Sequence, residues 1–429
     1  MTHQPDRKGE DPAELIIKGD IAVEGNRLLQ VGPEGALSPD WKPDKIINGK
    51  DLLCLPGLIN CHTHAAMTLL RSYADDLPLM YWLEKKIWPL EARLTEEDVY
   101  WGTLLALIEM IRSGTTTFND MYFFMEEVAR AVENIGIRAC LARGLIGNGS
   151  QADKGLEESR ALIERWQEGA NGRIKVWLGP HAPYTCPPSY LKKVVALARE
   201  YGVRIHIHVS ETRDEVKQIE AQYKKTPVGY LEEVGLFQVP VLAAHCVHLT
   251  RDDINLLAES GASIAHNPES NMKLASGIAP VKDLRAAGIT VGLGTDGAAS
   301  NNNLDMFEEM RTAALLHKVI NEDPLTLPAP EVILMATREG SRALGLEKEV
   351  GMLKPGLKAD LILINLEQAH LCPRHNLLAH LVYAAQAHDV DTVMIDGKVV
   401  MENRKILTVD EELVRNEVEK RAQRLIAPD

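Results

Sequence analysis

The sequence lacks both a long apolar run and an excess of positive charge. A membrane helix needs about 18 to 20 successive apolar residues, which no run here provides. Residues 1–12 are polar and charged, unlike the apolar core of a signal peptide. With 47 Lys and Arg against 61 Asp and Glu, the formal net charge is −14, the wrong sign for neutralising phosphates. We therefore expect a cytoplasmic protein that binds neither membranes nor nucleic acid, and the composition leaves a homo-oligomer open.

Cysteine is also scarce, with six residues in 429. No two of them form a C-x-x-C pair, and an even number alone does not make a disulfide framework in so long a chain. We expect reduced, mostly buried thiols. Because 45% of the residues are hydrophobic, the chain can bury a large core.

Both ends of the sequence have a β pattern without helical periodicity. Residues Glu14 to Leu53 suggest short strands, with turns expected at Gly19-Asp20, Gly25-Asn26 and Asn48-Gly49. Similar runs return at 359–365 and 392–400. We therefore expect the two ends to build one small β-sandwich domain together.

Between these ends, short apolar runs that finish in polar residues alternate with longer helical stretches. Eight such units predict a (β/α)8 TIM-type barrel, an α/β fold whose active sites lie at the carboxyl ends of the strands. Glycines after the preceding helices, for example Gly136 and Gly202, are typical left-handed caps. We assign residues 1–55 and 349–429 to the β domain, the latter with a terminal helix, and 56–348 to the barrel. The eight runs are Leu58–His64, Thr115–Asp120, Arg138–Gly144, Ile174–His181, Arg204–Glu211, Val239–His245, Ala262–Asn267 and Thr290–Asp296.

The connection from Ala65 to Thr95 is too long for an ordinary link between a strand and its helix. We expect it to form a lid or a pocket wall.

The first strand ends in His62-Thr63-His64, and residues two apart on a strand point to the same face. Such a pair alone is often only a hydrogen-bonded part of the core. The fifth strand, however, carries a second pair, His206 and His208, and the eighth ends at Asp296. Three imidazoles and a carboxylate from three strand ends suit zinc or a similar divalent ion, with a position left for water.

The motifs at these strand ends resemble those of the amidohydrolase superfamily. They are the His-x-His after Pro56-Gly-Leu-Ile, the segment His208-Val-Ser-Glu211, Ala244-His245-Cys246, His266-Asn-Pro-Glu-Ser-Asn271 and Thr295-Asp296-Gly297. Within the superfamily the sequence most resembles the deaminases of S-adenosylhomocysteine and 5'-methylthioadenosine, and the match spans nearly the whole chain. Triazine chlorohydrolases and guanine deaminases share much of this framework. The resemblance to the first group lies in Trp82, Pro89-Leu-Glu91, Arg143, Gly179-Pro-His181-Ala-Pro-Tyr184 and Ser300.

The resemblance implies one divalent metal, most simply Zn²⁺, held by His62, His64, His208 and Asp296. His206 would then be a packed barrel histidine, one layer deeper than His208. Relatives with two metals carry a carboxylated lysine at the end of strand four, where this chain has Leu-Gly-Pro-His. The implied count is therefore one metal.

The resemblance also implies hydrolytic deamination through a metal-bound hydroxide. Asp296 would be both ligand and base, and Glu211 would carry a proton to the ring nitrogen. His245 would hold the attacking hydroxide or the developing tetrahedral centre. The plainer alternatives are a salt-bridged rim carboxylate for Glu211 and a core imidazole for His245.

The expected substrate is a small nucleoside. Glu91 resembles the carboxylate that accepts the ribose hydroxyls; alternatively it is a first-turn helix charge near Arg93. Arg143 would pair with the carboxylate of adenosylhomocysteine. The following loop, 145–155, offers only Lys154 as a further cation, so the sequence does not rank the two substrates. The other implied contacts are Trp82 (or Trp88) on the purine or sulfur substituent, His181 on the purine or ribose, and Ser300.

Two other functions compete with this interpretation. The same metal site could dechlorinate a triazine or deaminate guanine or another heterocycle, although Glu91 favours a ribose-bearing substrate. A non-catalytic scaffold is the alternative of another class. Such scaffolds lose metal ligands, whereas this sequence keeps the full set.

Overall fold

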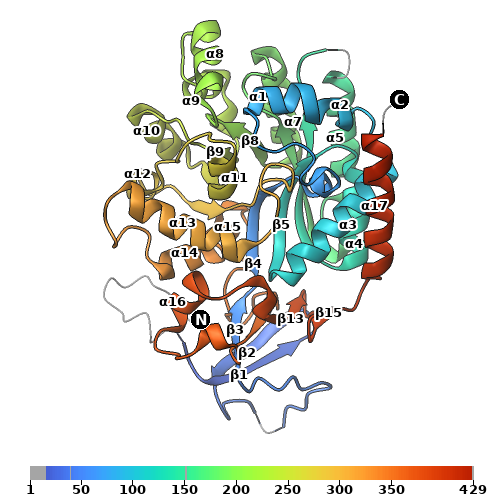
Figure 1. The fold of residues 1–429 in the computed structure, drawn as a ribbon, viewed down its shortest axis with the longest axis vertical. Helices are drawn as coiled ribbons and strands as arrows, with labels where there is room; N and C mark the ends of the chain where they lie inside the picture. The colour runs from blue at the N-terminus through green and yellow to red at the C-terminus, as the bar shows by residue number, and fades with distance from the viewer. Residues whose placement is uncertain (1–15, 39, 150–151, 428–429) are drawn as a thin grey trace.

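The computed structural model describes residues 16–38, 40–149 and 152–427. Residues 1–12 and the expected start of the first β segment at Glu14 lie outside these ranges. A barrel of strands and helices stands on a small β domain that contains segments from both ends of the chain (Figure 1). Within the described ranges, no helix is both long and apolar enough to cross a membrane.

Eight parallel strands form the barrel and follow one another around it in chain order. Each of the eight apolar runs forms one of these strands. Asp296 N donates to His62 O at 2.9 Å, which joins the last strand region to the first. The predicted TIM-type barrel is therefore confirmed. Its strands are β4 (Leu58–Thr63), β5 (Thr115–Tyr122), β6 (Arg138–Leu145), β7 (Ile174–Pro180), β8 (Ile205–Val209), β9 (Val241–His245), β10 (Ser263–His266) and β11 (Val291–Leu293).

Helices cover the outside of the barrel (Figure 1). Several preceding a strand end at a glycine in the left-handed conformation, as expected, including α4 at Gly136 and α7 at Gly202. The helices are α3 (Glu96–Arg112), α4 (Met125–Ile135), α5 (Ala152–Trp166), α6 (Gly169–Gly172), α7 (Pro188–Tyr201), α8 (Arg213–Tyr223), α9 (Pro227–Val234), η4 (Leu236–Gln238), α10 (Arg251–Ser260), α11 (Pro268–Lys273), α12 (Val281–Ala286), α13 (Met306–Ile320), α14 (Ala329–Met335) and α15 (Arg338–Ala343).

The long connection after β4 folds into short helices above the mouth of the barrel (Figure 1). Six of its side chains line the cavity described below. The expected pocket wall is thus present. Its elements are η2 (Ala65–Leu70), α1 (Leu79–Trp82), η3 (Leu83–Ile87) and α2 (Trp88–Glu91).

The β domain consists of a five-stranded and a two-stranded antiparallel sheet. Apolar side chains from both sheets, including Leu28 and Leu361, share one buried cluster, as expected for a small sandwich. A turn at Gly25-Asn26 joins the first two strands, but the turn predicted at Gly19-Asp20 is wrong, because both residues pair within β1. The sheets contain β1 (Gly19–Glu24) with β2 (Arg27–Pro33), and β15 (Lys405–Ile406), β14 (Lys398–Glu402), β13 (Val390–Ile395), β12 (Leu361–Asn365) and β3 (Leu52–Pro56) in that order.

A buried ion pair ties the barrel to the β domain. Arg138, at the amino end of β6, is 1% exposed, and its Nε donates to Asp360 Oδ2 at 2.9 Å. This contact lies at the end of the barrel opposite the strand termini that carry active sites, so its role is structural.

The C-terminal helix α17 (Glu411–Ile426) lies along α3 of the barrel (Figure 1). Arg421 Nη1 lies 3.4 Å from Asp98 Oδ1, and Arg424 pairs with the same carboxylate. Two further short segments, η5 (Ala369–Leu371) and η6 (Ala387–Asp389), flank α16 (Leu377–Tyr383). The predicted boundaries between the β domain and the barrel, which place residues 56–348 in the barrel, stay a prediction.

Candidate functional site

Three histidine rings and a carboxylate meet at the carboxyl ends of the barrel strands. His62 lies in β4 and His208 in β8, while His64 and Asp296 follow β4 and β11. His62 Nε2 and His64 Nε2 each lie 3.3 Å from Asp296 Oδ1. His208 Nε2 lies 3.3 Å from His64 Nε2. The structure therefore brings together all four residues that the sequence suggested as metal ligands.

The spacing of these atoms fits one bound metal ion. Bonds of about 2.0–2.1 Å place neighbouring tetrahedral ligands roughly 3.3–3.4 Å apart, which is the separation observed. His62 Nε2 is also buried without a hydrogen-bond partner among the residues that the structure describes. Buried polar atoms rarely stay unpaired, so this nitrogen indicates a ligand. Imidazole nitrogens with one carboxylate are donors that suit zinc.

Hydrogen bonds to Nδ1 of His64 and His208 leave the lone pair of each ring on Nε2. His64 Nδ1 lies 2.6 Å from Met121 O, and His208 Nδ1 lies 2.6 Å from His181 O. A carbonyl oxygen only accepts hydrogen bonds, so each Nδ1 carries the hydrogen. The neutral ring then presents its Nε2 to a metal.

His206 lies one layer deeper and contacts the cluster from behind. Its Nε2 lies 2.8 Å from His62 Nδ1, and its Nδ1 lies 3.0 Å from the side-chain amide of Asn119. Its nitrogens do not join the groups of converging ligand atoms among the described residues. His206 thus orients His62, in agreement with the barrel position expected for it.

The charges of the cluster depend on burial and on Asp296. Burial lowers the pKa of His62 to about 3, so this ring is neutral at pH 7. Burial by itself would lower the pKa of His64, but the contact with Asp296 has the larger effect, and the net pKa is raised to about 9. Burial disfavours the charge on Asp296, yet the two histidines hold its pKa well below the usual range. This carboxylate therefore binds a cation, either a proton shared with His64 or a metal.

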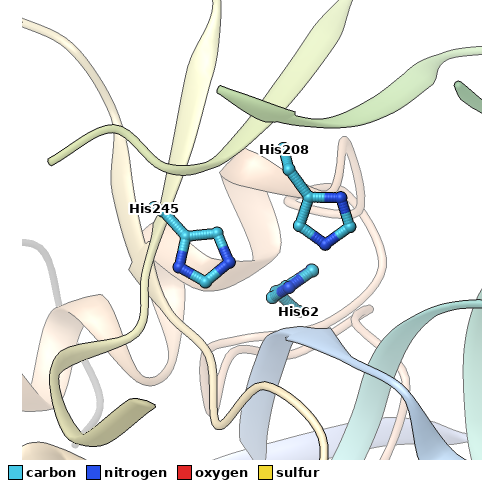
Figure 2. Close-up of side chains that lie close together, drawn as sticks. All are labelled: His62, His208 and His245. Carbon is cyan, nitrogen blue, oxygen red and sulfur yellow. The ribbon is translucent and has the colours of Figure 1, made fainter. Parts of the chain in front are cut away.

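His245, at the end of β9, completes the ring of imidazoles around His62 (Figure 2). It is 1% exposed, and its Nδ1 lies 2.8 Å from Asn271 Oδ1. Since the amide oxygen accepts, Nδ1 carries the hydrogen and Nε2 faces His62 and His208, with which it forms a group of converging ligand atoms. The orienting role of Asn271 was not deduced from the sequence, although the residue belongs to one of the quoted motifs.

Glu211 lies beside this ring of nitrogens. Its Oε2 is 4.0 Å from His245 Nε2, and burial raises its pKa above that of an exposed glutamate. The backbone nitrogens of Ser210 and Glu211 donate to the buried carboxyl of Glu215 at 2.9 and 2.7 Å. Glu215, in the first turn of α8, therefore fixes the backbone that carries Glu211, a role that the sequence did not indicate.

The second oxygen of Asp296 is held by two hydroxyl groups. Ser270 Oγ and Ser300 Oγ donate to Asp296 Oδ2 at 2.6 and 2.8 Å. Ser300, expected among the substrate contacts, thus orients the carboxylate as well as lining the cavity. Ser270 was missed by the sequence argument.

Backbone strain accompanies these residues. His245, Asp296 and Ser210 have φ angles of 71°, 60° and 52°, in the left-handed region that non-glycine residues rarely adopt. Such strain typically occurs where a side chain must be aimed at a functional centre.

A cavity opens above the histidines. Trp82 and Trp88 both line it, so the structure does not choose between them as the residue that covers the substrate. Burial lowers the pKa of His181 to about 4, which keeps this ring neutral. The expected site residues along its walls are His64, Trp82, Glu91, His181, His208, Glu211, His245, Asp296 and Ser300.

Glu91 faces the cavity from α2. Tyr122 Oη donates to its Oε1 at 2.8 Å, and burial raises its pKa. Glu91 is also the acidic residue in the first turn of α2, so the alternative of a first-turn helix charge stays open, although the following helix α3 begins only at Glu96 with Thr95 as its cap. Tyr122, at the end of β5, is a further residue that the sequence did not indicate.

Arg143 lies outside the residues that line this cavity. It borders a second cavity, which shares Trp88, Glu91, Phe123 and Ile146 with the first. Its Nε donates to Glu158 Oε2 at 2.8 Å, and its guanidinium stacks on Phe123 at 5.1 Å from the ring centre. Lys154 Nζ lies 3.6 Å from Glu158 Oε1.

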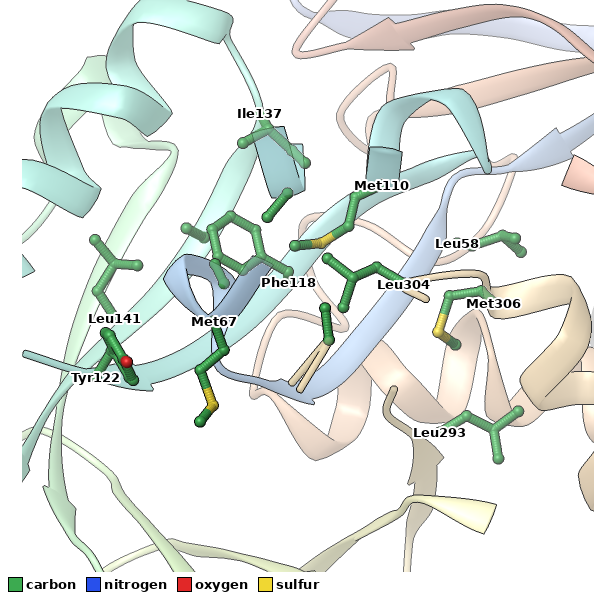
Figure 3. Packing of buried hydrophobic residues seen from close by; sticks show 14 of the residues in the cluster. Leu58, Met67, Met110, Phe118, Tyr122, Ile137, Leu141, Leu293, Leu304 and Met306 are labelled. Atoms are coloured by element: carbon green, nitrogen blue, oxygen red, sulfur yellow. The ribbon is translucent and has the colours of Figure 1, made fainter. Parts of the chain in front are cut away.

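A buried apolar layer supports the strands that carry the first ligands. Leu58, Met110 and Phe118 belong to the cluster that packs around β4 and β5 (Figure 3). Rigid packing of this kind keeps a site within the tolerance that catalysis needs.

Comparisons with known proteins agree on one family. Residues 53–400 match the model of the amidohydrolase family. The chain is 62% identical to a 5-methylthioadenosine/S-adenosylhomocysteine deaminase of Pelotomaculum thermopropionicum, over 97% of this chain and 96% of that one. A zinc-bound adenosine deaminase from Xanthomonas campestris superposes with a TM-score of 0.91 at 37% identity, covering 94% and 93% of the two chains. The zinc complex of an atrazine chlorohydrolase from Arthrobacter aurescens gives 0.87 at 26% identity and 94% coverage of both.

Proposed function

This chain belongs to the amidohydrolase family, and from that premise we propose that it hydrolytically deaminates 5'-methylthioadenosine and S-adenosylhomocysteine with one bound zinc ion. The observation that carries the proposal is the set of 3.3 Å separations among His62, His64, His208 and Asp296, next to Glu211. The names of relatives that match nearly the full chain support the substrate class.

His62, His64 and His208 would hold the ion through Nε2, and Asp296 would hold it through Oδ1. A divalent metal bound there supplies the acidity that lets water ionise near neutral pH. One ion is expected, because the end of β7 offers no lysine to bridge a second.

Hydrolysis places the oxygen of water on the ring carbon that carries the amine. One proton of that water ends on the adjacent ring nitrogen and the other on the departing ammonia. Asp296, whose Oδ2 is oriented by Ser270 and Ser300, would take the first proton. Glu211, whose pKa is raised by burial, is suited to deliver a proton to the ring nitrogen. His245 Nε2 is placed to steady the oxygen that attacks.

The nucleoside would be selected by groups around the cavity. Glu91 would accept the ribose hydroxyls, since Tyr122 occupies Oε1 and leaves Oε2 available. Trp82 or Trp88 would cover the purine or the sulfur substituent. The cavity beside Arg143 offers space for the longer arm of adenosylhomocysteine. The carboxylate of adenosylhomocysteine would have to share Arg143 with Glu158. We therefore expect this carboxylate to add only modestly to the binding of the substrate.

The test is ammonia release from 5'-methylthioadenosine, S-adenosylhomocysteine, adenosine, guanine and atrazine by the zinc-loaded protein. Both thioether nucleosides should exceed guanine and atrazine in kcat/KM by at least a hundredfold, on the order expected when buried polar groups go unpaired. Preferential turnover of guanine, or chloride release from atrazine, would replace this function with one of the alternatives.

A cytoplasmic location, the lack of membrane and nucleic-acid partners and a homo-oligomeric state stay predictions. Size-exclusion chromatography with light scattering addresses the last of them directly.

A further inference from the structure

A second group of converging side chains lies away from the barrel mouth, around α16. His370 lies in η5, and His388 and Asp389 lie in η6. His370 Nε2 is 2.8 Å from Asp389 Oδ2, and His388 Nε2 is 3.3 Å from Asp389 Oδ1. The two imidazole rings, with centres 5.6 Å apart, thus approach the two oxygens of one carboxylate.

Within this group, burial and a backbone hydrogen bond hold the side chain of Asp389 in place. Its side chain is 0% exposed, and Gln386 N donates to Oδ2 at 2.9 Å. Oδ1 has no hydrogen-bond partner among the residues that the structure describes. An unpaired buried carboxylate oxygen is costly, and a cation between the two rings would remove that cost.

Arg404, a cation close enough to interact with Asp389, does not fill this role. The positive charge of Arg404 is felt by Asp389, but its Nη1 donates to Ala387 O at 2.9 Å and to Val390 O at 2.6 Å. The guanidinium therefore lowers the negative potential at Asp389 without hydrogen bonding to Oδ1.

We propose that His370, His388 and Asp389 form a second metal site, for a borderline divalent ion such as Zn²⁺ or Cu²⁺. The 3.3 Å between His388 Nε2 and Asp389 Oδ1 matches the roughly 3.3 Å between neighbouring ligands of one zinc ion, and the 2.8 Å between His370 Nε2 and Asp389 Oδ2, now a hydrogen-bond distance, would widen by about half an ångström when an ion replaces the proton. Two imidazoles and a carboxylate are donors for this class of metal, and water would complete the coordination.

This site is weaker than the barrel site. It has three ligands instead of four, and His388 is 56% exposed, so the ring must be immobilised when the ion binds. It should therefore fill only after the barrel site is saturated. A bound ion would tie η5 to η6 and so fix the ends of the segment that contains α16.

The experiment uses protein whose barrel site is already loaded with zinc. Samples are dialysed to equilibrium against rising free Zn²⁺, and bound metal is measured by elemental analysis. Wild type should reach about two equivalents per chain, and His388→Asn about one, with unchanged deamination of 5'-methylthioadenosine. His375→Asn, which removes another exposed histidine of the same segment, should still reach two. Cys372→Ser should as well, which excludes the exposed thiol.

Copper gives a second readout that elemental analysis does not. With Cu²⁺ in the second site, electron paramagnetic resonance should show coupling to two nitrogens in wild type and to one at most in His388→Asn. Saturation of wild type at one equivalent would overturn the proposal. A second equivalent that survives in His388→Asn would also overturn it, because the ion would then be bound elsewhere.

Discussion

Replacing Arg143 with methionine should separate the two proposed substrates. Methionine keeps an apolar stem similar to that of arginine but removes the guanidinium, which stacks on Phe123. Only adenosylhomocysteine carries a carboxylate for that group. Its kcat/KM should fall while that of 5'-methylthioadenosine stays nearly constant.

The size of the loss follows from the exposure of the site. Side chains of Arg143 and Glu158 are 17% and 39% exposed, so their own pair lies between a surface bridge and a buried one. Surface pairs contribute about 0–1 kcal/mol, and truncating a desolvated partner costs about 2–5 kcal/mol. A substrate carboxylate that shares Arg143 with Glu158 should contribute about 1.4 kcal/mol, which corresponds to a tenfold loss. The change for methylthioadenosine should stay below about threefold.

Glu158→Gln provides the complementary test. If Glu158 competes for Arg143, the substitution should raise kcat/KM for adenosylhomocysteine about two- to fivefold and leave methylthioadenosine unchanged. The gain should vanish in the Arg143→Met background, because the two residues act through one contact. Glu157→Gln, an exposed neighbour on α5, is the matched control.

Steady-state kinetics on both substrates decide between the outcomes. Equal losses in Arg143→Met would make Arg143 a structural residue. No loss on either substrate would mean that Arg143 does not contact the substrate carboxylate. A lower rate in Glu158→Gln would mean that Glu158 orients Arg143 instead of competing for it.

Four other substitutions test the remaining parts of the site. Glu211→Gln should keep the metal but lose about 10²–10⁴ in kcat, since proton transfer typically contributes that much; a parental rate would assign the proton transfer to another residue. His64→Ala should lose both the single tightly bound metal and the activity, measured by elemental analysis and ammonia release, and full activity in stripped protein would contradict this. Glu91→Ala should weaken all ribose-bearing substrates alike, by roughly 2–3 kcal/mol in kcat/KM, whereas an effect on one nucleoside only would exclude the ribose contact. Burial raises the pKa of Glu215 from 4.5 to about 8. Between these two pH values the folded state keeps a proton that the unfolded state releases, so the free energy of unfolding falls as the pH rises. Glu215→Gln cannot titrate, so its unfolding free energy relative to wild type should rise between about pH 5 and 8 in denaturant titrations; a constant difference would argue against a buried acid.

The barrel and the convergence of the four proposed metal ligands could be predicted because they follow from short repeating rules. Apolar runs separated by helical stretches predict the strands, and the carboxyl-end rule predicts where the polar residues gather. His62 and His64 share a face because they are two residues apart on or next to a strand. The turn at Gly19-Asp20 failed because turn-forming residues also occur where a strand begins, and pairing with β2 decided the outcome.

The residues that orient the ligands could not be predicted in the same way. Asn271, Ser270 and Glu215 lie in helices after the strands, and their partners are up to 26 residues away along the chain. Which side chain reaches the cluster depends on left-handed backbone at residues such as Ser210, which no periodicity reveals. In the sequence, nothing distinguishes Tyr122 from an ordinary buried aromatic residue. Only the fold places Glu91 of α2 within hydrogen-bond distance of its hydroxyl group.

The same division explains why the chemistry is easier to infer than the substrate. The proposed metal ligands lie on or within a few residues of strands whose register the barrel fixes, so their convergence hardly depends on the loops. Arg143 also lies on a strand, but its guanidinium is directed by Glu158, fifteen residues later on α5. The docking of that helix decides whether Arg143 serves the cavity above the metal ligands or the one beside it. Specificity for the amino-acid end of the substrate is therefore set by helix and loop packing, and the paired Arg143 and Glu158 substitutions measure that packing directly.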